Sequence, residues 1–254
     1  MKNVMDEPLL IFALFFFTLW LSAQMGASVL NRRRMEEGVR EDFGVILAAT
    51  LSILGLIIGF SFSMAINRYD QRKNCEEAEA NAIGTEYLRA DLLPPADAAT
   101  VRALLKNYLN QRVLFYTTRH EEQLRGINAT TAQLQAELWS AAQAPATAHP
   151  SPVIAQAVSG MNDVLNSQGY TQAAWWNRIP HGGWGLMAVT AVCCNLLIGY
   201  GARNVKAERT LLLVLPLLVS IAFALIADID SPRGGVIRVI PQNLQSLAQS
   251  LGAQ

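Results

Sequence analysis

The stretch LSILGLIIGFSFSMAINRYDQRK, Leu51–Lys73, begins as an apolar segment and ends as a charged one. It contains no proline, and its two glycines, Gly55 and Gly59, lie within the apolar part. Proline would kink or end a helix, whereas a long apolar run of about 20 residues favours a membrane-spanning helix. We therefore expect one helix that crosses a lipid bilayer and continues into water without a break, as far as Pro94 and Pro95.

The composition of the whole chain is that of a membrane protein. Of its 254 residues, 52% are hydrophobic and only 16% are charged, and the apolar residues gather in long runs. The first run has an acidic leading flank and no small-residue cleavage site, so we expect a retained helix rather than a signal peptide. Four runs are candidates for spanning a bilayer: Leu9–Leu30, Phe43–Ile66, Trp184–Tyr200 and Leu211–Ala227.

The long segment between the second and third runs is polar and reads as helical. Apolar residues recur in it at helical spacing, no alternating strand pattern is present, and a loop is expected at Ala141–Pro152, where three prolines occur. The sequence thus predicts an all-α fold in four parts. These are a first transmembrane hairpin (1–66), a helical extramembrane domain (67–183), a second transmembrane hairpin (184–227) and a C-terminal extramembrane segment (228–254).

Several classes of function lack support in the sequence. Lysine and arginine (20) balance aspartate and glutamate (20), so there is no net positive field to attract nucleic acid. The three cysteines and three histidines show neither metal-ligand spacing nor a catalytic arrangement, and no glycine-rich phosphate loop is present. We expect no enzyme activity, no metal, no cofactor and no nucleic-acid partner.

Two faces of the second apolar run carry different side chains. Gly55 and Gly59 are the centre of a stripe of small residues, which is typical of close packing between membrane helices. Leu56 and Phe60 belong to a bulky row that can face the axis of an oligomer as a hydrophobic constriction. The two interpretations are compatible, because they concern different faces.

Charged residues follow directly after this run. Arg68, Arg72 and Lys73 either anchor the helix at the lipid headgroups or attract anions to the mouth of a pore. Glutamates within 76–79 can pair with them and cancel the field. Further along, Glu79, Glu86 and Arg89 allow a buried ion-pair site, but we favour a solvated helix face or a packing contact with the next helix. Asn195, in the middle of the third run, is expected to hydrogen-bond a neighbouring helix.

Several stretches of the sequence resemble those of a known protein family. The stretch Leu51–Lys73 and the stretch ADIDSPRGGVIRVIPQNLQSLAQSL, Ala227–Leu251, resemble the bestrophin anion channels. Together with EANAIGTEYLRADLLP, Glu79–Pro94, the chain as a whole resembles a group of bacterial membrane proteins of unassigned function that are called bestrophin-like. This resemblance implies a pentameric chloride channel in the bilayer, with a helical domain that extends the pore.

The resemblance also implies particular residues. The neck of the pore would be Ser52, Leu56 and Phe60, and Ser52 departs from the bulky apolar residue that the family has there. A serine widens and wets that ring. No calcium site is carried over, because Asp228 and Asp230 alone do not supply the roughly six or more oxygen ligands that calcium takes.

Membrane orientation and function each keep two alternatives. The acidic flank before the first run and the three arginines after it, Arg32–Arg34, place the 67–183 domain in the periplasm, whereas the resemblance implies a cytoplasmic domain of a protein in the bacterial inner membrane. One functional hypothesis is a homo-oligomeric anion channel whose pore is lined by the second run. The other is a pore-less, membrane-anchored sensor or interaction module.

Overall fold

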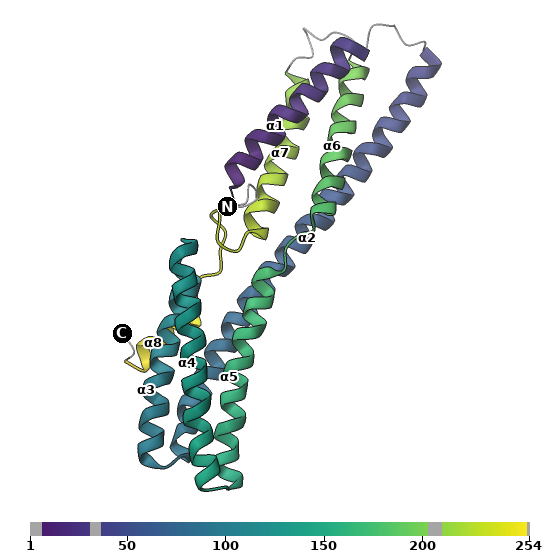
Figure 1. Cartoon of the computed structure of the whole chain (residues 1–254). Coiled ribbons are helices and arrows are strands. Elements are labelled where there is room, and N and C mark those ends of the chain that lie inside the picture. Colours follow the sequence, from purple (N-terminus) through teal and green to yellow (C-terminus); the bar gives the residue numbers. More distant parts are fainter. Residues whose placement is uncertain (1–6, 31–36, 203–209, 253–254) are drawn as a thin grey trace. The chain divides into compact units, whose positions relative to one another are not determined.

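The computed structural model describes residues 7–30, 37–202 and 210–252, and these residues form helices and no strands (Figure 1). This confirms the predicted all-α fold. The loop 31–36, with the arginines of the orientation argument, and the loop 203–209 lie outside the described residues. The elements are α1 (Pro8–Met25), a π-helical turn (Gly26–Leu30), α2 (Glu37–Arg89), a 3-10 turn (Ala90–Leu92), α3 (Pro95–Thr117), α4 (Glu121–Ala148), α5 (Pro152–Trp176), α6 (His181–Gly201), α7 (Leu211–Asp230) and α8 (Gln242–Ser250).

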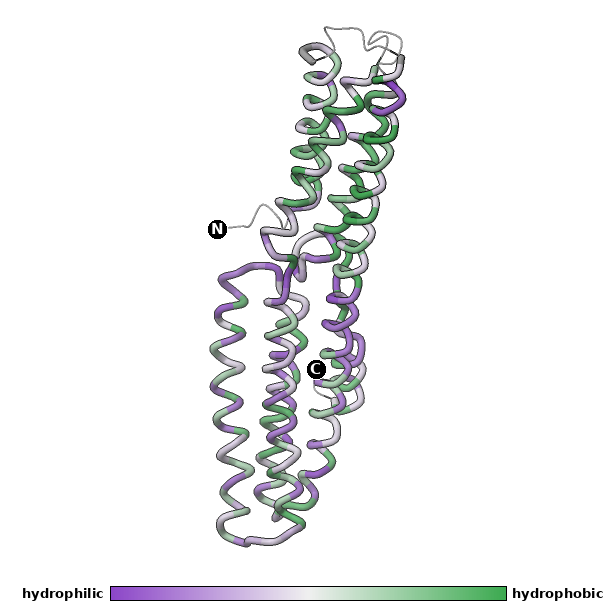
Figure 2. Tube along the Cα trace, turned by 90° about the vertical axis from the view of Figure 1, so that its right-hand side faces the viewer, coloured by the Kyte–Doolittle hydropathy of each residue, from purple (hydrophilic) through white to green (hydrophobic). Residues whose placement is uncertain are grey.

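Four segments of the described chain contain a helix long and apolar enough to cross a membrane, as the sequence predicts. Helix α2 is unbroken from Glu37 to Arg89, so the predicted continuation of the second run as one helix is confirmed. Figure 2 shows the strongest hydrophobic colouring on the helices of these segments. The four segments are Pro8–Ser28, Gly38–Leu92, Pro152–Gly201 and Leu212–Asp230.

The chain forms two compact units, one of residues 1–68 and 178–238 and one of residues 69–177 and 239–254. The C-terminal segment predicted as one part (228–254) is thus divided between the two units. In the first unit, α1 packs against both α6 and α7. The Phe223 ring of α7 meets Phe15 of α1 and Trp184 of α6 edge to face, with centroid distances of 4.7 and 6.3 Å.

The second unit contains the polar end of α2 with α3, α4, α5 and α8. Its core has fully buried apolar side chains from each of these helices, for example Ile83, Leu105, Leu138, Met161 and Leu244. Pro152 stands at the first turn of α5, where the missing N–H leaves no bond unmade, and the Ser151 side chain accepts from the Ile154 amide at 3.2 Å.

The loop expected at Ala141–Pro152 is mostly helical, so that prediction is wrong. Helix α4 continues to Ala148 with Pro145 inside it, and only residues 149–151 separate it from α5. The reason is packing: Leu138, Ala142 and Pro145 fall on one face of α4 and are all buried. Burial of that face, together with the strong helix propensity of alanine, outweighs the one hydrogen bond that proline removes.

Candidate functional site

The three residues predicted as a neck lie one turn apart on an exposed face of α2. Leu56 is 58% and Phe60 is 63% exposed, and Ser52 is also exposed. The Ser52 hydroxyl donates to the Ala48 carbonyl of its own helix at 2.8 Å, so it is satisfied without an outside partner. The chain thus presents a row of large apolar side chains to its surroundings.

The predicted packing role of Gly55 and Gly59 has no counterpart inside the single chain. A Cβ placed on either glycine meets no atom within 4 Å in the part of the chain that is described. The close helix contact is elsewhere: a Cβ on Gly199 of α6 would lie 2.0 Å from the Ala23 carbonyl oxygen, and one on Gly26 would lie 2.2 Å from that of Leu196. Packing of Gly55 and Gly59 against a second copy stays a prediction.

The three cationic residues predicted at the mouth do not share a face of α2. Lys73 is exposed, but Arg72 is only 1% exposed and belongs to the interior of the second unit. Arg68 is largely buried, and its Nη1 lies 3.9 Å from Asp230 Oδ1. Successive helical residues are turned by about 100°, so Lys73 points away from Arg68 and Arg72, which lie four residues apart on one face. The burial of Arg72 counts against a part for it at an anion mouth, and the mouth role of the three residues stays a prediction.

Asp228 and Asp230, at the end of α7, hold backbone amides in the first unit. Asp228 Oδ1 accepts from the Val236 amide at 2.7 Å, and Oδ2 accepts from Ile237 at 2.9 Å. Gly235 makes this turn possible, because its φ is +67° and a Cβ there would lie 1.6 Å from Asp228 Oδ1. Asp230 accepts from the Ile179 amide at 3.1 and 3.2 Å.

A buried ion pair lies at the centre of the second unit. The guanidinium of Arg112, on α3, donates to both carboxylate oxygens of Glu79, and both side chains have no exposed surface. Glu79 Oε2 also accepts from the Tyr116 hydroxyl at 3.3 Å and from the Thr171 hydroxyl at 3.2 Å. The network therefore joins α2, α3 and α5 through one carboxylate.

Of the two favoured expectations for Glu79, Glu86 and Arg89, the solvated face is wrong for the two glutamates, whereas Glu79 does make a packing contact with the next helix, α3. Glu79 and Glu86 are fully buried, and the partner of Glu79 is Arg112 rather than Arg89. Sequence reasoning did not single out Arg112. A signal was present, since Arg112 falls on the same face of α3 as the buried Tyr108, Leu109 and Phe115.

Electrostatics in this network follow from burial and from the Glu79 charge. Burial, and next the Glu79 carboxylate, raise the pKa of Tyr116 well above its usual range. Burial alone would lower the pKa of Arg112, but Glu79 outweighs it and the pKa is raised. Arg112 also lies over the Phe115 ring, 4.3 Å from its centroid. The network therefore keeps the Tyr116 phenol neutral.

A second glutamate of α2 stabilises the last helix of the chain. Glu76 is 1% exposed, and its Oε1 accepts from the Leu244 amide at 2.9 Å. Its Oε2 accepts from the Asn243 side-chain amide at 2.7 Å. These groups belong to the first turn of α8, where amides have no partner within the helix and a negative charge is favoured. The Glu76 carboxylate of α2 thus acts as an N-cap for α8.

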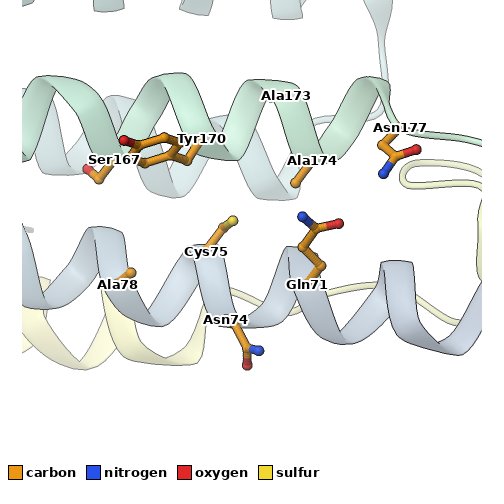
Figure 3. A pocket seen from close by; sticks show the side chains of 9 residues that line it. All are labelled: Gln71, Asn74, Cys75, Ala78, Ser167, Tyr170, Ala173, Ala174 and Asn177. Carbon is orange, nitrogen blue, oxygen red and sulfur yellow. The ribbon is translucent and has the colours of Figure 1, made fainter.

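A groove of about 650 Å³ separates α2 from α5 in the second unit, and Figure 3 shows the side chains that line it. Cys75 and Gln71 point from α2 toward α5. Burial, and next Glu79, raise the pKa of the Cys75 thiol, so it is a poor nucleophile at neutral pH. The lining has no charged side chain and consists of Gln71, Asn74, Cys75, Ala78, Ser167, Tyr170, Ala173, Ala174 and Asn177.

Among the described residues, Asn195 does not make the hydrogen bond to a neighbouring helix that the sequence predicts, and it bonds within its own helix instead. It is fully buried, and its Nδ2 donates to the Ala191 carbonyl of its own helix α6 at 2.8 Å. Its Oδ1 has no hydrogen-bond partner among the described residues. Those residues also contain no group of three or more histidine, cysteine, aspartate or glutamate side chains placed to hold a metal ion.

A family model for the Bestrophin-like domain matches residues 10–244, which is nearly the whole chain. The chain belongs to the Bestrophin-like family. It is a membrane protein, as its four apolar helical segments also indicate. Comparison with curated proteins finds no match.

Solved structures of bacterial bestrophin homologues share the fold of this Bestrophin-like chain. A homologue from Klebsiella pneumoniae, phased from zinc, is 14% identical with a TM-score of 0.59, covering 96% of this chain and 94% of the other. A single-residue variant of a Klebsiella pneumoniae homologue is 14% identical with a TM-score of 0.60, covering 99% and 98%. A crystal structure described only as a membrane protein is 12% identical with a TM-score of 0.64, covering 96% and 97%.

Proposed function

We propose that this protein is a homo-oligomeric ion channel with inorganic anions as cargo, and that α2 lines the pore. The observation that carries the proposal is the exposed row on α2, with Leu56 and Phe60 each more than half exposed. One copy of α2 cannot enclose a path, but a ring of copies can bring such rows together as a hydrophobic constriction. The Bestrophin-like family of the chain supports this assignment.

Finer features of the proposal rest on the family resemblance. We propose a pentamer in the bacterial inner membrane, with the second unit in the cytoplasm. The neck would be Ser52, Leu56 and Phe60, and Ser52 makes one ring wetter than the other two. Of the three basic residues past the apolar run, Lys73 is the exposed one and would act at the mouth.

The alternative of a pore-less sensor or interaction module predicts that the small-residue stripe is buried within one subunit. Gly55 and Gly59 meet no atom within 4 Å in the described chain, which counts against it. The two hypotheses differ in the assembly that they require. The mass of the detergent-solubilised complex separates them: a ring supports the channel, and a monomer contradicts it.

Ion flux tests the neck. Phe60→Ala removes the largest side chain of the row, so we expect faster chloride flux from liposomes that contain the variant. Ile58→Ala is a matched control, because Ile58 is an apolar residue of the same turn that points away from the row and is half-buried. Equal flux for both variants and wild type would contradict the assigned neck. A reversal potential that follows the cation gradient would contradict the anion assignment alone.

A further inference from the structure

Glu86 is a buried carboxyl group that no neighbour satisfies. Its side chain is 0% exposed, and neither carboxylate oxygen has a hydrogen-bond partner among the described residues. Glu79 lies two turns earlier on the same face of α2. It is also buried, but it accepts four hydrogen bonds from α3 and α5. A buried carboxylate without donors is strongly disfavoured, and the neutral acid is much less so.

The space around Glu86 is shaped for this side chain. A Cβ on Gly160 of α5 would lie 2.0 Å from Glu86 Oε2 and 2.4 Å from Arg89 Nη1, so both side chains pack directly against this glycine. Gly160, Arg89 and Asp163 also line a small hollow of about 290 Å³ at the surface of the second unit. The carboxyl group therefore lies behind a single glycine, close to water.

Two charged groups act on Glu86, one from its own helix and one from the helix packed against it. Arg89 follows one turn later on α2, and Asp163 is on α5. Arg89 Nη1 lies 3.9 Å from Asp163 Oδ2, and Asp163 is 63% exposed. On the next helix, Arg102 is already paired with Asp91. Arg89 thus stands between a buried carboxyl group and an exposed one.

We propose that Glu86 binds a proton in the folded protein, and that release of this proton draws Arg89 from Asp163 to Glu86. In the protonated state, the neutral acid needs no counter-ion and Arg89 pairs with Asp163. On deprotonation, the proton leaves to water through the hollow at Gly160, and the new buried carboxylate attracts the guanidinium. The device couples pH to the contact between α2 and α5.

The electrostatic environment agrees with this geometry. Burial is the largest cause and raises the pKa of Glu86 to about 8, with Arg89 lowering it and Asp163 raising it. Because the folded pKa exceeds the unfolded one, the protonated form stabilises the fold, and stability falls as pH rises from about 4.5 to about 8. Above that range the stability no longer changes through this group.

The test is an infrared titration of the full-length protein in detergent, from about pH 6 to about pH 10. Wild type should show the carbonyl band of a protonated carboxyl group that disappears with an apparent pKa near 8, and Glu86→Gln should lack this change. Arg89→Gln should move the midpoint up, and Asp163→Asn should move it down. The opposite directions are the signature of a group placed between these two charges.

Two results would overturn the proposal. One is the absence of the protonated band at about pH 6, since an ordinary glutamate is ionised there. The other is an identical midpoint in wild type, Arg89→Gln and Asp163→Asn. Thermal unfolding provides a second readout, in which Glu86→Gln should remove the part of the decline in melting temperature that this group causes between about pH 4.5 and about pH 8. None of these measurements depends on ion conduction, so they stand apart from the test of the channel.

Discussion

The two halves of α2 reverse the usual distribution of residues between surface and core. Its apolar half exposes large side chains such as Leu56 and Phe60. Its polar half buries four charged side chains, each at most 1% exposed: Arg72, Glu76, Glu79 and Glu86. In soluble proteins, large apolar side chains are usually buried and charged side chains are usually exposed, so each half of α2 departs from this rule.

The difference shows that the two halves are stabilised by different means. Exposed apolar side chains are stable only against lipid or against another apolar protein surface, so the first half requires a medium that the chain does not supply. Buried charges are stable only with partners close by, and Glu79 and Glu76 have theirs within the second unit. Substitutions in the two halves should therefore have different effects.

The largest effect is expected at the buried ion pair. Arg112→Met leaves Glu79 buried without its cation, and breaking such a pair lowers stability by about 3–5 kcal/mol. The second unit should unfold at a clearly lower temperature, measured by circular dichroism on the purified protein. The double variant Glu79→Gln/Arg112→Met is the control. Its glutamine still accepts from Tyr116 and Thr171 without a buried charge, so it should recover much of the loss.

This prediction would be contradicted by a double variant that is as unstable as Arg112→Met or less stable. That result would mean that Arg112 acts through its packing against Phe115 and not through the charge of Glu79. The comparison between the halves would then lose its electrostatic basis.

Gly199 of α6 and Gly59 of α2 compare a glycine packed within the chain with one on an exposed helix face. Gly199→Val forces a side chain against the Ala23 backbone of α1, and overpacking of this kind lowers stability by roughly 1–3 kcal/mol. Gly59→Val enters open space and should leave the melting temperature of the chain unchanged. Size-exclusion chromatography adds a second readout, since dissociation of an oligomer by Gly59→Val alone would place Gly59 at a subunit contact. Equal destabilisation by both variants would contradict the distinction.

The architecture was largely predictable from the sequence. Runs of about 20 apolar residues separate spanning helices from soluble ones by length alone, and the absence of proline in 51–73 predicted the unbroken α2. The helical conformation of 141–148 was not predictable, because the prolines of this segment indicate a loop. Burial of Ala142 and Pro145 against other helices decides that segment, and local propensity does not contain this information.

The candidate site was less predictable, for a physical reason. Arg72, Glu76, Glu79, Ile83, Glu86 and Ala90 follow one another at alternating steps of four and three residues, which is the spacing of a buried helix face. Because four of the six are charged, hydrophobic periodicity assigns this face to water. Only a partner such as Arg112, 33 residues from Glu79 in sequence, reverses that assignment.

The smallest effect is expected where α2 stabilises α8. Glu76→Gln keeps an acceptor for the Leu244 amide but removes the negative charge at the first turn of α8, a loss of about 1 kcal/mol for a helix N-terminus. Exchange of the Leu244 amide with deuterium should become roughly fivefold faster. Glu77→Gln is the matched control, because this substitution removes the same charge one residue away and Glu77 is exposed. Equal acceleration by both variants would show that α8 responds to the net charge of the region. Acceleration by Glu76→Gln alone would show that the polar half of α2 acts through buried, specific contacts.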